Sequence, residues 1–85
     1  MENFPDLKHT EVALMRSDAL TGHVLDDECV LALNGAQKVY TRFSDIELAL
    51  RYADSIILNK VNIECVIYGK NKEVLHYLSS RNIKP

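Results

Sequence analysis

The segment Ser44–Lys60, SDIELALRYADSIILNK, carries the strongest structural signal in the chain and predicts an amphipathic helix. Its apolar residues recur at steps of three and four, which places them on one buried face: Ile46, Ala49, Leu50, Ala53, Ile56 and Ile57. Ser44 and Glu47 have the spacing of a capping box, so Ser44 is the expected N-cap residue. The helix should end at Asn59 or Lys60, before a β-branched run.

A β-hairpin is expected before the helix, over Cys29–Phe43 (CVLALNGAQKVYTRF). Two apolar runs flank Asn34-Gly35 there, and this dipeptide favours the tight turn of a two-residue hairpin loop. After the helix, Val61–Tyr68 alternates between its two faces and predicts a further strand. Turn residues follow, and Glu73–Leu78 is interpreted as a returning strand, with a C-terminal helix over residues 72–82 as the alternative.

The N-terminal part of the chain fits two interpretations. Residues 10–21 are predicted as a helix or a turn-rich segment that stops at Gly22, and a short strand beginning at Glu11 is the alternative. Residues 1–9 contain Pro5 and few apolar groups, which predicts a loose arm, and residues 79–85 are expected to fray.

These elements together predict a single α+β domain spanning residues 1–85. Its small antiparallel sheet consists of two hairpins in ββαββ order, with one amphipathic helix packed on one face and an N-terminal segment before the first strand. The sheet face that the helix covers should bury seven side chains: Leu31, Leu33, Val39, Phe43, Ile63, Cys65 and Ile67.

The 85 residues carry a formal net charge of −2, with 47% hydrophobic and 26% charged residues. This composition is that of an ordinary globular domain, and its acidic balance gives no general attraction to nucleic-acid backbones. No apolar run reaches the length of a membrane span, and residues 1–9 lack a signal-peptide core. We therefore expect a cytoplasmic protein without membrane contact. Cys29 and Cys65 stand in apolar surroundings and are interpreted as reduced, buried thiols.

Two runs resemble a family of small uncharacterised bacterial ββαββ domains: FSDIELALRYA at residues 43–53 and VIYGKNKEV at residues 66–74. In that family a phenylalanine precedes a Thr/Ser-capped helix, and a later strand ends near a Gly-Lys/Arg-Asp turn. This chain departs from the pattern at Leu48, where the family has alanine, and at Asn71, where it has aspartate. The resemblance covers about half of the chain and implies the fold, because no activity is established for the family.

No motif for phosphate binding, metal-dependent hydrolysis or nucleophilic catalysis occurs in the sequence. Cys65, His76 and Glu64 are the residue types of a nucleophile with its base, but Cys65 and Glu64 should point to opposite faces of one strand. The histidines do not fall at metal-ligand spacing either. We therefore expect no enzyme activity, no catalytic residue, no metal site and no cofactor.

Several large side chains have no place in the predicted core, and they predict contact with another protein. Five should project from the sheet face opposite the helix and two should flank the helix: Tyr40, Arg42, Tyr68, Leu75 and Tyr77, with Leu48 and Tyr52. Tyrosine and arginine are enriched in protein interfaces, so a binding or regulatory module is expected that forms a homodimer or docks on a partner protein. A phage or plasmid accessory protein that inhibits a bacterial host factor would fit this pattern.

Two alternatives to this interface stay open. In the first, the flank of the helix packs within the monomer, and residues before Gly22 fold back over the tyrosine-bearing face: Val12, Leu14, Met15 and Leu20. In the second, that face binds single-stranded nucleic acid, with tyrosines stacking on bases and Arg42 beside phosphates. The net negative charge and Glu64 on the same face argue against a nucleic-acid partner.

Overall fold

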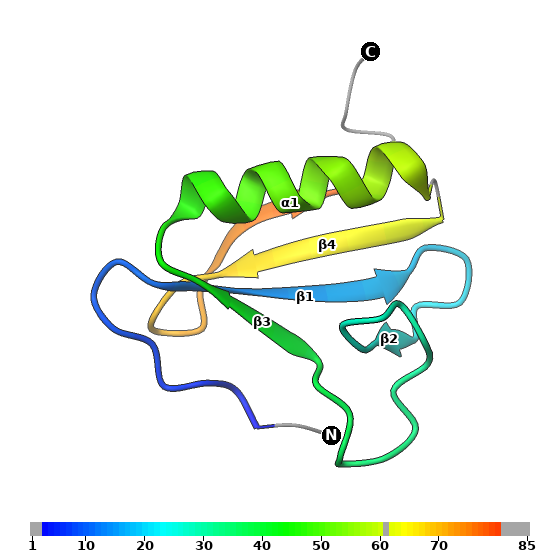
Figure 1. Cartoon of the computed structure of the whole chain (residues 1–85), viewed down its shortest axis with the longest axis horizontal. Helices are drawn as coiled ribbons and strands as arrows, with labels where there is room; N and C mark the ends of the chain where they lie inside the picture. Colours follow the sequence, from blue (N-terminus) through cyan, green and yellow to red (C-terminus); the bar gives the residue numbers. More distant parts are fainter. Residues whose placement is uncertain (1–2, 61, 81–85) are drawn as a thin grey trace.

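The computed structural model describes residues 3–60 and 62–80 and has one helix packed on a five-stranded antiparallel sheet (Figure 1). The elements follow in the order β1 (Val12–Asp18), β2 (Val24–Leu25), β3 (Tyr40–Phe43), α1 (Ile46–Asn59), β4 (Ile63–Tyr68) and β5 (Val74–Leu78). The predicted α+β class, with strands before and after the helix, is confirmed. The returning strand near the C-terminus is confirmed over the helical alternative, and Val61 lies outside the described residues.

β1 is the central strand of the sheet. Along one edge it pairs with β4, from Ala13 opposite Tyr68 to Asp18 opposite Ile63. Along the other edge β3 pairs with its first half and β2 with its second half. β5 pairs with β4 and forms an outer edge of the sheet. The central strand thus connects parts of the chain that are far apart in sequence.

The core lies between α1 and the sheet face that it covers (Figure 1). α1 buries Ala49, Ala53 and Ile57, as its helical periodicity predicts. The strands contribute six buried residues to the same cluster: Val12, Leu14, Leu25, Ile63, Cys65 and Ile67. Because side chains alternate along a strand, the intervening residues lie on the opposite face, which we call the open face.

The N-cap residue of α1 is Asp45 rather than the predicted Ser44. Asp45 has an extended backbone, and its carboxylate accepts a hydrogen bond from the Leu48 N–H at 3.1 Å. A negative charge at this position also interacts favourably with the helix dipole, which a serine hydroxyl does not match. The N-cap thus lies one residue after the predicted one, and Leu48, three residues beyond it, has no side-chain acceptor to complete a capping box. The predicted end at Asn59 is confirmed.

The helical interpretation of residues 10–21 is wrong, because this segment contains the central strand β1. Val12 and Leu14 face α1, whereas Ala13 and Met15 lie on the open face. A strand that is covered on both faces need not alternate between apolar and polar residues. The run from Val12 to Met15 therefore lacks the two-residue period by which a half-exposed strand is recognised.

The predicted hairpin over Cys29–Phe43 is wrong in its first half. β3 pairs with β1, and residues 29–33 contribute an isolated bridge between Leu31 and Leu25. Leu31 and Leu33 are 41% and 81% exposed, so neither belongs to the core. Residues 26–39 form a loop, the 26–39 loop, in which side chains satisfy backbone amides in place of a second strand.

Residues 3–8 pack against the open face, in contrast to the loose arm that their composition predicts. Leu7 is only 3% exposed, and Phe4 contacts aromatic rings of β3 and β4. Figure 1 shows this segment on the side of β1 and β3 that faces away from α1. In the predicted fraying tail Ser79 is buried and Ser80 exposed, and residues 81–85 lie outside the described residues.

Candidate protein interface

The seven predicted interface residues occupy three different environments. Three lie near the N-terminal segment (Tyr40, Arg42 and Tyr68), one contacts a buried arginine (Tyr52), and three are exposed (Leu48, Leu75 and Tyr77). The structure therefore does not bring them together as one surface, and each environment has its own physical basis.

Phe4, Tyr40 and Tyr68 form an aromatic cluster on the open face. The Phe4 ring lies 5.2 Å from that of Tyr40 and 5.8 Å from that of Tyr68, in edge-to-face arrangements. The two tyrosine rings are 6.4 Å apart, and such pairs are favourable because ring edges and faces carry opposite partial charges. The Lys72 ammonium nitrogen also lies 5.7 Å from the Phe4 ring centre, within cation–π distance.

The N-terminal segment is thus the part of the chain that covers Tyr40 and Tyr68. The sequence analysis considered coverage of this face by the same chain as one alternative. The covering residues in the structure are not the four that it named. Val12 and Leu14 face α1 instead, and Leu20 is 77% exposed in the turn after β1.

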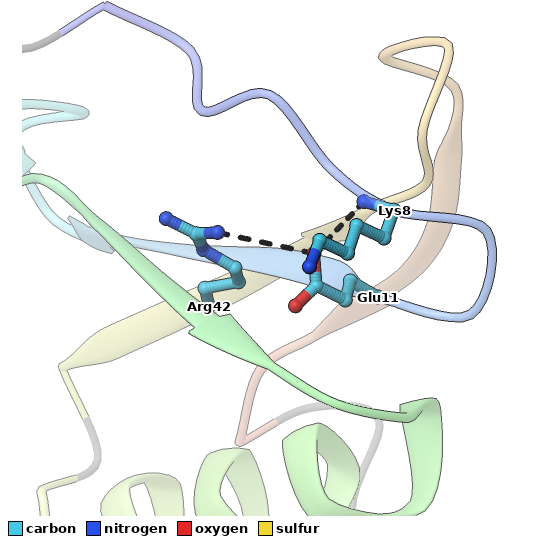
Figure 2. Close-up of polar contacts among 3 residues, drawn as sticks. All are labelled: Lys8, Glu11 and Arg42. Atoms are coloured by element: carbon cyan, nitrogen blue, oxygen red, sulfur yellow. Dashed lines mark hydrogen bonds and ion pairs between the residues drawn. The ribbon is translucent and has the colours of Figure 1, made fainter.

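Glu11 links the N-terminal segment to β3 by a hydrogen bond and an ion pair (Figure 2). Its Oε1 atom accepts a hydrogen bond from the Lys8 backbone N–H at 2.8 Å and lies 3.9 Å from Arg42 Nη1. The Glu11 N–H in turn donates to the Lys8 carbonyl at 3.0 Å, which closes a turn. The Arg42 side chain is about half exposed, so this ion pair contributes little to the free energy of folding.

Arg16 of β1 is fully buried, and the sequence analysis did not single it out. Its Nε donates to the Asp26 carbonyl at 2.9 Å, and its Nη2 donates to the Val39 carbonyl at 3.0 Å. Its Nη1 donates to the hydroxyls of Thr41 at 2.8 Å and Tyr52 at 3.1 Å. No carboxylate of the described chain forms an ion pair with it. Arg16 therefore joins β1, the 26–39 loop, β3 and α1 by hydrogen bonds.

Tyr52 is held by these same contacts. The Tyr52 hydroxyl accepts a hydrogen bond from Arg16. The centre of the Tyr52 ring lies 5.8 Å from the guanidinium carbon of Arg16 and 5.3 Å from the ring centre of Phe43. Tyr52 thus packs against side chains of β1 and β3, beneath α1. These contacts account for a tyrosine at this position without a second chain, in agreement with the alternative of packing within the monomer.

Asp26 organises the 26–39 loop next to Arg16. Its Oδ1 accepts from the N–H groups of Glu28 and Val30, and its Oδ2 accepts from the Gln37 side-chain amide at 2.7 Å. These bonds, chiefly the one from Gln37, hold the pKa of the Asp26 carboxyl below its ordinary value.

β5 is an edge strand with exposed apolar side chains. Among the described residues it pairs with β4 and with no other strand. Val74, Leu75 and Tyr77 are 60%, 40% and 51% exposed, and the strand sequence VLHYL contains no Asp, Glu, Lys, Arg or Pro. Edge strands usually carry such residues because they hinder pairing with another chain. Leu75 and Tyr77 belong to the predicted interface, while Val74 is an addition from the structure.

An open groove of about 540 Å³ adjoins this strand. Its apolar lining comes from Leu75 of β5, Ile46 of α1 and Val12 of β1. Leu48, the remaining exposed residue of the predicted interface, is 44% exposed on α1 and does not line this groove.

The three residues weighed as a nucleophile with its base do not form a catalytic set: Cys65, His76 and Glu64. Burial raises the pKa of the Cys65 thiol to about 11, so the thiol stays protonated near neutral pH. Glu64 lies on the opposite face of β4, as the strand alternation predicts, and His76 is exposed on β5. Within residues 3–60 and 62–80, no three His, Cys, Asp or Glu side chains are placed to hold a metal ion.

Comparison with known protein families, with curated proteins and with solved structures finds no match to this chain. The resemblance to small bacterial ββαββ domains therefore stays a prediction. In the described part of the chain, no helix has both the length and the apolar composition needed to cross a membrane.

Proposed function

We propose that this protein is a binding module that acts through contact with another protein, by forming a homodimer or by docking on a partner. The observation that carries the proposal is β5, an edge strand without Asp, Glu, Lys or Arg whose apolar side chains are exposed. An unpaired strand edge offers backbone N–H and C=O groups in a fixed row, and these groups bind an added strand well. Its exposed leucine, valine and tyrosine would add apolar area to such a contact.

The three predicted contact tyrosines outside β5 are more covered than Tyr77. Phe4 lies against Tyr40 and Tyr68, and Tyr52 is bonded to Arg16, so these side chains already have partners in the monomer. The groove beside Leu75 extends the apolar area next to β5. Both cysteines are free thiols, which supports action in a reducing compartment such as the cytoplasm.

Sedimentation velocity over a concentration series tests self-association, with Leu75→Lys and Leu48→Lys as a matched pair. The two leucines are 40% and 44% exposed, but they lie on β5 and on α1 respectively. We expect Leu75→Lys to raise the dimer dissociation constant roughly tenfold or more, because a lysine on a strand edge opposes pairing. Leu48→Lys should leave this constant unchanged.

Two outcomes would count against the proposal. A protein that is monomeric at hundreds of micromolar does not self-associate, which removes the homodimer. Equal effects of the two lysine substitutions would show that β5 has no special part in the contact. Circular dichroism of both variants establishes that each is folded before it is compared.

Binding of single-stranded nucleic acid has less support. Tyr40 and Tyr68 would have to stack on bases, yet the Phe4 ring lies against both of them. Base stacking on these rings would require displacement of the N-terminal segment. Titration of a labelled oligonucleotide at low salt, where phosphate contacts are strongest, should therefore show no binding.

A further inference from the structure

We propose that two copies of this chain pair their β5 strands antiparallel about a two-fold axis at Tyr77, which joins the two sheets into one continuous sheet. This inference rests on the proposed function and specifies the partner as a second copy. It also specifies which residues meet across the contact.

The edge of β5 selects an extended strand as its occupant. β4 occupies one edge of β5, and no described strand occupies the other. A β-bulge lies where the pairing shifts between Ile67 and Tyr68, so the regular part of β5 runs from His76 to Leu78. Bulges interrupt pairing, and a strand added at this edge would therefore be aligned on this regular part. Tyr77 is its middle residue.

Self-pairing is favoured by the symmetry and the charges of this strand. Two identical edges related by a two-fold axis necessarily run antiparallel, and they close into a dimer without leaving a further site. With the axis at Tyr77, His76 lies opposite Leu78 of the second copy, and Leu75 lies opposite its Ser79. No charged residue meets a like charge along the described strand, because Lys72 and Glu73 precede it.

The second edge of the sheet is less suited to pairing. β3 carries Arg42, whose side chain is about half exposed, and charged residues on an edge strand hinder its pairing. β2 is only two residues long, and the 26–39 loop bridges to it through Leu31 and Leu25. β5 is thus the edge on which a second copy can add a strand.

Tyr77 itself has a position that suits a contact across the axis. It pairs with Val66 of β4 and projects from the open face, where half of its surface is exposed. Directly opposed aromatic side chains on one sheet face stabilise a strand pair. The proposed register would bring the two Tyr77 side chains together there.

Disulfide trapping tests the register, using Tyr77→Cys and the control Val74→Cys, both in a Cys29→Ser background. Opposed residues of antiparallel strands have Cα atoms about 5 Å apart, which a disulfide can bridge. The two Val74 residues would be about 20 Å apart in this register, because six residues separate them along the strand direction. Val74 is no less exposed than Tyr77, so accessibility does not favour the test position.

We expect Tyr77→Cys to form a covalent dimer under mild oxidation at least tenfold faster than Val74→Cys. If the unmodified protein sediments as a dimer but Tyr77→Cys is no faster than the control, the β5 register is refuted and the proposed homodimer stands. If the unmodified protein is a monomer at hundreds of micromolar, the β5 register and the proposed homodimer are both refuted. Because Tyr77→Cys removes a side chain of the contact, sedimentation of the reduced variant measures how much dimer is present to be trapped.

Discussion

Replacement of Arg16 by methionine should strongly destabilise this protein, although it removes a buried positive charge that has no ion-pair partner in the described chain. Methionine has a similar length and is apolar, so it fills much of the same space. The charge itself is costly to bury, and its removal alone would be favourable. The outcome therefore depends on the groups that Arg16 leaves behind.

Four hydrogen-bond acceptors lose the donor that Arg16 supplies in Arg16→Met. The hydroxyls of Thr41 and Tyr52 belong to half-buried residues and can turn towards other partners. The Asp26 carbonyl keeps a second donor, the Cys29 N–H at 3.0 Å. The Val39 carbonyl belongs to a fully buried residue and loses the donor that Arg16 supplies. Removal of one partner of a buried hydrogen bond costs ~1–3 kcal/mol, so the loss at Val39, with smaller losses at the other three acceptors, predicts a decrease of ~2–4 kcal/mol in the free energy of unfolding.

Urea unfolding measures this loss, and Arg51→Met on the exposed side of α1 serves as the control. With the m-value typical of a small domain, Arg16→Met should lower the midpoint by roughly 1–3 M, whereas Arg51→Met should change stability by less than ~0.5 kcal/mol. Arg16→Lys should not restore stability, because one ammonium group cannot reach four acceptors as the planar guanidinium does. A loss below ~1 kcal/mol for Arg16→Met, or full rescue by lysine, would refute this reasoning.

Four further predictions follow from the same structure. Ile63→Ala should cost ~2–5 kcal/mol in urea unfolding, because Ile63 is 7% exposed and its loss leaves a cavity; a cost below ~1 kcal/mol would mean that it is not core. Phe4→Ala should cost ~1–3 kcal/mol and speed proteolytic cleavage before residue 9, since it removes two aromatic contacts; unchanged cleavage would contradict this packing. At pH 8 Cys65 should react with a thiol reagent far more slowly than Cys29, because burial raises the pKa of Cys65 to about 11. In urea the two thiols should react alike, and equal rates in the folded protein would contradict the burial of Cys65. The lowered pKa of Asp26 should stabilise the fold above about pH 4, and this contribution should be lost as the pH falls through the folded-state pKa. Thermal unfolding measured as a function of pH should show this decline in the unmodified protein, and the Asp26→Asn variant should lack it.

The helix and β4 could be predicted from the sequence because each shows a single clear period. The apolar positions of α1 repeat at helical spacing, and those of β4 alternate strictly between buried and half-buried. Both elements have one covered face and one that is less covered, which is the condition under which a period is visible. The N-cap was misplaced because Ser44 and Asp45 are adjacent and either could act as a cap by residue type.

The first hairpin could not be predicted correctly, because its turn signal belongs to a loop. Asn34 Oδ1 accepts from the Ala36 N–H, and Gln37 Oε1 accepts from the N–H groups of Leu33 and Asn34. These local bonds give the chain an alternative to strand pairing. Arg16 completes that alternative, since it binds the carbonyls at the two ends of the loop, at Asp26 and Val39.

The four tyrosines of the chain show why an interface could not be located from the pattern of exposed positions alone. Strand alternation assigns Tyr40, Tyr68 and Tyr77 to one face, and all three do project from the side of the sheet opposite α1. Their surroundings nevertheless differ, because Phe4 packs on the first two, whereas Tyr77 lies on the edge strand and is 51% exposed. Which of them is available to another chain depends on where the N-terminal segment lies, and that is a long-range contact with no local sequence signal. The test substitutions Leu75→Lys and Tyr77→Cys therefore lie on β5, whose outer edge pairs with no strand of the described chain.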